Sequence, residues 1–104
     1  MIDVLKDVEL LLPWEKCSER LENELSREVS EGHILYGIKA VSIAKRIDND
    51  DLLFFLPNNK YLFAVVHLTW SKESNSSEFP QTVLYSSLKE WVNKCMKVDN
   101  ENYL

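Results

Sequence analysis

The sequence predicts a single α+β domain, in which two helices pack on one face of a small antiparallel sheet. Three features indicate this class: a helical apolar stripe in the first third, β-prone runs separated by turn residues in the middle, and a second helical stripe near the C-terminus. The chain has 104 residues, the size of one domain. We expect a three- to four-stranded meander with a long N-terminal helix and a C-terminal helix.

The first helix is predicted from Pro13 to Gly32. Proline suits the first turn of a helix, and glycine suits the left-handed position just beyond its end. Between them, apolar side chains recur at steps of three and four, which is typical of an amphipathic helix; they are Trp14, Cys17, Leu21, Leu25 and Val29. Residues 1–12 are apolar enough for a short helix of their own.

Three β-prone runs follow, at residues 36–47, 52–56 and 61–70. DNDD and PNNK separate them, and both are turn-forming sequences because Asn tolerates positive φ. The first run alternates imperfectly, which predicts a β-bulge near Ala40–Val41. A short run at Thr82–Tyr85 gives the fourth, edge strand.

The C-terminal helix is predicted to begin at Ser87. Ser87 and Glu90 have the spacing of a capping box, in which the serine side chain accepts from the backbone three residues later. The apolar stripe behind this cap consists of Leu88, Trp91, Val92 and Cys95. Residues 97–104 are expected to form a frayed tail.

Charge is distributed unevenly along the chain. The formal net charge is −5; residues 1–31 hold nine acids and four bases, whereas residues 32–104 hold eight of each. An acidic segment repels phosphates, so we expect no nucleic-acid ligand. It would accelerate the docking of a basic protein, although a solvated helix face is the simpler interpretation.

No apolar run reaches the ~18 residues of a membrane helix. The first residues carry acids where a signal peptide carries bases. We therefore expect no membrane partner and a cytoplasmic location.

Catalytic and metal-binding patterns are missing from the sequence. Cys17 and Cys95 both lie on predicted apolar stripes, where thiols behave as inert small hydrophobes. Together with His33 and His67 they lack the spacing of a zinc site. We expect no catalytic residue, no metal, no cofactor and no enzymatic activity.

The strand containing VVHLTW raises one alternative. Its alternation places Val65, His67 and Thr69 on one face, and Ala64, Val66, Leu68 and Trp70 on the other, which is the better core face. The simplest interpretation is a structural polar pair, His67 and Thr69, that organises the loop after Trp70. The alternative is a small hydrolase in which His67 acts as a base beside an acidic residue.

The turn at residues 48–51 concentrates acidic groups. It contains Asp48, Asp50 and Asp51 but lacks the glycine and distal glutamate of a calcium-binding EF-hand loop. A solvated hairpin tip is the simpler interpretation, and a contact surface for a basic partner is the alternative. A polar loop at residues 71–81 adds Glu73 and Glu78.

The chain also resembles a known group of proteins over about two-thirds of its length. The matching pieces are EGHILYG at 31–37, AKRIDNDDLLF at 44–54, VVHLTWS at 65–71, and Pro80, Thr82, Tyr85 and SLKEW at 87–91. This VHLTWS…P.T..Y.SL.EW pattern resembles a family of small bacterial proteins. Where the family pattern has a glycine after Trp-Ser, Lys72 stands here. Proteins of this kind are similar to immunity proteins carried beside toxin genes, including those of contact-dependent growth inhibition systems.

The resemblance implies a cytoplasmic protein that binds a cognate toxin and occludes its active site. Combined with the acidic charge, it favours a basic nuclease toxin as the partner. The expected partner-binding residues are Asp48, Asp50, Asp51, Trp70, Glu73 and Glu78, with Trp70 as an aromatic anchor. The remaining alternative is a regulatory or adaptor protein, which is a monomer or a weak dimer formed through an exposed strand edge.

Overall fold

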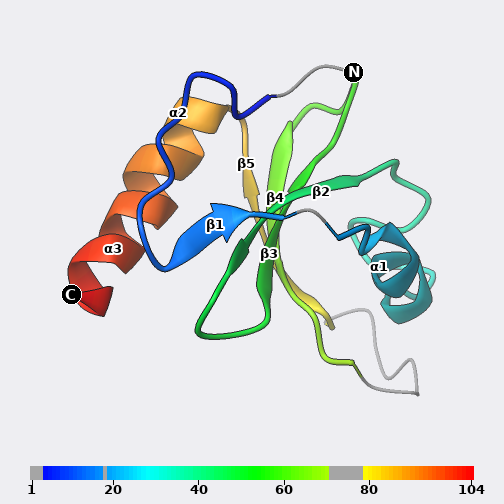
Figure 1. Ribbon diagram of the computed structural model, residues 1–104. Helices are drawn as coiled ribbons and strands as arrows, with labels where there is room; N and C mark the ends of the chain where they lie inside the picture. The colour runs from blue at the N-terminus through cyan, green and yellow to red at the C-terminus, as the bar shows by residue number, and fades with distance from the viewer. Residues whose placement is uncertain (1–3, 18, 71–78) are drawn as a thin grey trace.

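The computed structural model of the protein describes residues 4–17, 19–70 and 79–104 (Figure 1). The described residues form one antiparallel sheet of five strands in the order β1-β2-β3-β4-β5. The α+β class and the meander order are confirmed, whereas the expected number of three to four strands is wrong. The strands are β1 (Trp14–Lys16), β2 (Val41–Arg46), β3 (Asp51–Phe55), β4 (Phe63–His67) and β5 (Gln81–Tyr85).

The long N-terminal helix is replaced by a strand and a short helix. β1 pairs with β2, where Trp14 lies opposite Arg46, and the helix α1 spans Glu22–Glu28. Trp14 and Leu25, which shared one predicted stripe, lie in two different hydrophobic clusters. Burial of Trp14 on the sheet outweighs the helical periodicity of the sequence. Residues 4–12 form turns and irregular chain instead of the predicted short helix.

The sheet is covered on both faces, because the C-terminal helix and α1 lie on opposite sides of it (Figure 1). The prediction that both helices share one face is therefore wrong. On the C-terminal helix side, Trp14 meets Trp91 edge to face, with ring centroids 5.2 Å apart. On the α1 side, Leu25 and Leu35 cover alternate residues of β3 and β4. Strands that are buried on both faces have continuous apolar sequences, as LLFF in β3 and FAVV in β4 do here.

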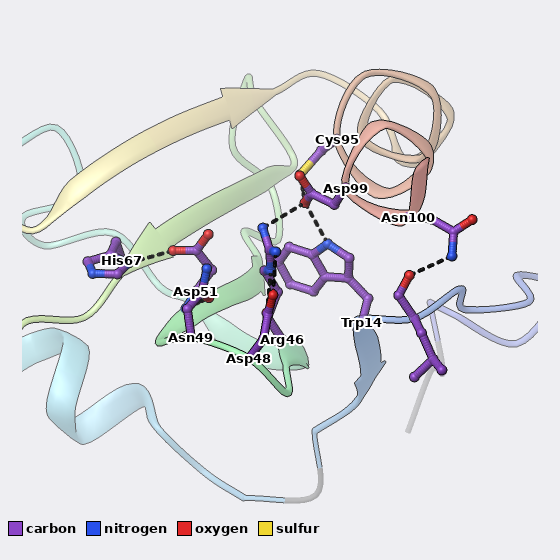
Figure 2. A network of polar contacts seen from close by, with 10 residues as sticks. Trp14, Arg46, Asp48, Asn49, Asp51, His67, Cys95, Asp99 and Asn100 are labelled. Atoms are coloured by element: carbon purple, nitrogen blue, oxygen red, sulfur yellow. Dashed lines mark hydrogen bonds and ion pairs between the residues drawn. The ribbon is translucent and has the colours of Figure 1, made fainter. Parts of the chain in front are cut away.

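The C-terminal helix runs further than predicted. It consists of α2 (Leu88–Trp91), a π-helical turn η1 (Val92–Met96) and α3 (Lys97–Tyr103), so residues 97–103 are helical and not a frayed tail. The predicted cap is present, since the Ser87 Oγ accepts from the Glu90 backbone N–H at 3.1 Å. The far end is held by Asn100, which donates to the Leu12 carbonyl at 2.6 Å (Figure 2).

A bulge in β2 fixes the segment that leads to α1. The register shifts between Ser42 and Ala44, slightly later than the predicted Ala40–Val41. The Ser42 hydroxyl donates to the Glu19 carbonyl at 2.9 Å and accepts from the Leu21 backbone N–H at 3.3 Å. The connection between β1 and α1 is thereby held along the sheet edge. Over the ranges described, we find no helix with the length and apolar character needed to span a membrane.

Candidate partner-binding site

Polar side chains form a row across the sheet where β3 begins and β4 ends. Strand register places Trp14 opposite Arg46 and places His67 between Asp51 and Gln81. Residues that lie opposite one another in antiparallel strands point to the same face. This row therefore lies on the C-terminal helix side of the sheet, and Figure 2 shows its contacts.

Arg46 occupies the centre of this network. Its guanidinium donates twice to Asp48, through Nε and Nη2, each at 2.8 Å, and its Nη1 lies 3.4 Å from the Asp99 carboxylate. The hydrogen bonds from Arg46 lower the pKa of Asp48. Both Asp48 carboxylate oxygens therefore accept hydrogen bonds within the turn.

Asp99 links the helix to the sheet in the same network. It accepts from the Trp14 indole Nε1 at 2.8 Å and from the Cys95 thiol at 3.5 Å. Burial, reinforced by the charge of Asp99, raises the pKa of Cys95 to about 12. The thiol is therefore protonated at neutral pH, and a protonated thiol is a poor nucleophile.

His67 and Thr69 have separate partners. The His67 Nδ1 lies 2.7 Å from the Asp51 carboxylate on the neighbouring strand, whereas Thr69 bonds to Glu28. The histidine side chain is half exposed, so its predicted position outside the core is confirmed. A carboxylate beside a histidine can orient it as a base, but the geometry equally suits a structural ion pair when the ring is protonated.

Glu28 is a buried carboxylate that sequence reasoning missed. It is 5% exposed and accepts from the Thr69 backbone N–H at 2.7 Å, the Thr69 hydroxyl at 2.8 Å and the Trp70 backbone N–H at 2.9 Å. Burial raises the pKa of Glu28, and a hydrogen bond with Glu24 raises it further. Arg27 in turn lowers the pKa of Glu24. The helix contains several glutamates, and no local sequence pattern indicates that Glu28 is the buried one.

Trp70 stands out by its backbone. Its φ is 56°, in the left-handed region that bulky residues rarely adopt, and its side chain is 49% exposed. The buried alternation of Ala64, Val66 and Leu68 is as predicted, but it ends there, so the assignment of Trp70 to the core face is wrong. A left-handed conformation costs about 1–2 kcal/mol for such a residue. The two backbone hydrogen bonds to Glu28 hold the chain in this conformation.

Trp70 borders a cleft of about 320 Å³ between the β1–α1 connection and the β2–β3 turn. Half-exposed Ile47 and Trp70 give it apolar walls. Four acidic and two basic residues belong to its lining. The lining consists of Glu15, Glu19, Leu21, Lys45, Arg46, Ile47, Asn49, Asp50, Asp51, Leu52 and Trp70. Lys45 is paired with Glu19 at 2.9 Å, Arg46 is turned to Asp48 and Asp99, and the Asp51 carboxylate is bonded to His67, which leaves Glu15 and Asp50 to set the charge. The cleft thus retains a negative balance and suits a cationic group that stacks on an aromatic face.

The structure brings some of the expected contact residues together at the cleft and places others elsewhere. Asp50, Asp51 and Trp70 come together at the cleft. Asp48 is held by Arg46, and Glu73 and Glu78 lie outside the described residues. Glu15 and Glu19 line the cleft although they were not expected there, because they belong to a segment predicted as helix. Within the described ranges, no group of three or more His, Cys, Asp or Glu residues is arranged to hold a metal ion.

Comparisons of the chain with protein-family models, with curated proteins and with solved structures found no match. Function is therefore inferred from the residues, from the geometry of the cleft, and from the resemblance described above.

Proposed function

We propose that this protein is an immunity protein, which binds a cognate bacterial toxin and neutralises it by occluding a basic active-site surface such as that of a nuclease. The observation that carries the proposal is the half-exposed Trp70, held at positive φ over the cleft. Strained backbone persists where the surrounding structure enforces it, and it concentrates at functional sites. Tryptophan is enriched among the few residues that carry most of the binding energy of protein interfaces.

The charge around Trp70 supports a basic partner. Glu15 and Glu19 bring the acidic N-terminal third of the chain to the cleft, beside Asp50 and Asp51. Such a surface attracts cationic side chains over a distance set by ionic strength. A nuclease active site, which must attract phosphates, presents that complementary charge.

Co-expression tests the proposal. The reading frame immediately upstream of this gene is expressed from an inducible promoter in bacterial cells, with this protein or with an empty vector. We expect growth arrest with the empty vector, rescue with this protein, and a co-purifying complex whose association slows as salt is raised. Absence of both rescue and a complex would contradict the proposal.

The small hydrolase remains the second candidate, favoured by the His67–Asp51 contact of 2.7 Å. The same co-expression separates the two functions. A His67→Ala variant that still rescues growth and still forms the complex supports occlusion, whereas loss of rescue with an intact complex supports chemistry by His67.

A further inference from the structure

The two edges of the sheet differ in how they are protected. β1 is three residues long, follows Pro13 and carries the charged side chains of Glu15 and Lys16. Short length, charge and proline are the devices by which edge strands avoid pairing with other chains. β5 also follows a proline, Pro80, but it is five residues long, QTVLY, with no charge and an unbroken register against β4. By length and charge, β5 is the less protected edge.

The outer side of β5 is open in the part of the chain that the structure describes. β5 stands last in the strand order, and no other strand pairs with it beyond β4. Val83, at its centre, is 54% exposed. Alternate residues of an edge strand direct backbone N–H and C=O groups outward, which makes the edge a template for one further strand.

We propose that β5 pairs antiparallel with β5 of a second copy, so that two sheets join into one continuous sheet across a twofold axis. This inference goes beyond the proposed function and does not depend on it. An antiparallel pair centred on Val83 sets Val83 against its own copy, so two half-exposed valines cover each other.

Charge favours a second copy as the occupant of this edge. Residues 79–88, FPQTVLYSSL, include no acidic or basic side chain, so no like charges meet across the axis. The excess negative charge lies in residues 1–31, which supply β1 at the other edge of the sheet. Two copies joined through β5 thus keep their acidic regions apart. The cleft of Trp70, lined from β1, β2 and β3, stays accessible in such a dimer.

Sedimentation equilibrium of the purified full-length protein, from micromolar to millimolar concentration, tests the pairing. We expect the mass to rise to that of a dimer. Val83→Lys should raise the dimer dissociation constant by about tenfold or more, because like charges placed opposite each other destabilise a strand pair. Val98→Lys is the matched control: Val98 is an exposed valine on α3, 45% accessible, and its substitution should leave the dimer unchanged.

A monomer at every concentration overturns the proposal, and so does a dimer that Val83→Lys leaves intact. Should Val83→Lys fail to fold, hydrogen exchange of the wild-type protein replaces it. Amides of residues 81–85 should then exchange more slowly as concentration rises. Exchange that is independent of concentration, or slowed only when the toxin is added, also overturns pairing between copies.

Discussion

Replacing Trp70 with alanine should weaken binding of the proposed toxin partner by about 2–4 kcal/mol, the usual range for a tryptophan anchor at an interface. The dissociation constant of the complex would then rise by roughly 30- to 1,000-fold. The expectation follows from the position of Trp70, half exposed at the rim of the cleft and preset by its backbone. A side chain ordered before binding loses less conformational freedom on binding, which increases its contribution to affinity.

Isothermal titration of the purified toxin, inactivated by mutation, measures this effect. Tyr103→Ala is the matched control, because Tyr103 is an aromatic side chain of similar exposure, 42%, on α3. The control should bind like the wild type, and Trp70→Ala should keep the wild-type circular dichroism spectrum, because the indole adds little to the core. Equal affinities for both variants and the wild type would place the interface elsewhere.

Replacing Glu28 with alanine should lower the free energy of unfolding by about 2–4 kcal/mol. The substitution removes the acceptor of three hydrogen bonds, from the Thr69 backbone, the Thr69 hydroxyl and the Trp70 backbone. It also removes the contacts that hold Trp70 at positive φ. We therefore expect Glu28→Ala to reduce toxin affinity as well, although its side chain is buried.

Urea denaturation at neutral pH measures the change in stability. Glu31→Ala, an exposed glutamate just beyond the same helix, is the control and should change stability by less than about 0.5 kcal/mol. The stability of Glu28→Gln should lie between those of Glu28→Ala and Glu31→Ala. Its amide oxygen still accepts hydrogen bonds, whereas its amide nitrogen faces a donor. A Glu28→Ala protein as stable as the control would show that these hydrogen bonds contribute nothing net.

The difference in stability between the wild type and Glu28→Gln should depend on pH, in a direction that follows from the pKa of Glu28. Burial raises the pKa of Glu28 in the folded protein above its ordinary value of 4.5. Between these two pKa values the folded state binds more protons than the unfolded state at this group, so its contribution to stability falls as pH rises. The difference in stability between wild type and Glu28→Gln should therefore change across this window and be constant well above it.

Local patterns in the middle of the chain predicted the structure well. Turns at DNDD and PNNK separate β-prone runs, and the structure has hairpins there, with Asn58 at a φ of 64°. The edge strand at Thr82–Tyr85 and the Ser87 cap were also predicted, because β-propensity and the spacing of the cap are both local features of the sequence.

The N-terminal third was predicted wrongly because its structure depends on distant contacts. Trp14 lies in a strand since it packs against Trp91 and bonds to Asp99, more than seventy residues away. The same long-range contacts extend the C-terminal helix through residues expected to fray. Part of the candidate site was therefore predictable, namely Asp50, Asp51 and Trp70, whereas Glu15, Glu19 and Glu28 reach it only through tertiary packing.

Hydrogen exchange of the protein, alone and with the toxin proposed as its partner, tests most directly whether the cleft of Trp70 is the binding surface. Occlusion through the cleft predicts slower amide exchange in the complex at the residues that line it, which are Glu15, Glu19, Leu21, residues 45–47 and 49–52, and Trp70. Slower exchange confined to the C-terminal helix or to β5, with the cleft unchanged, would contradict that account.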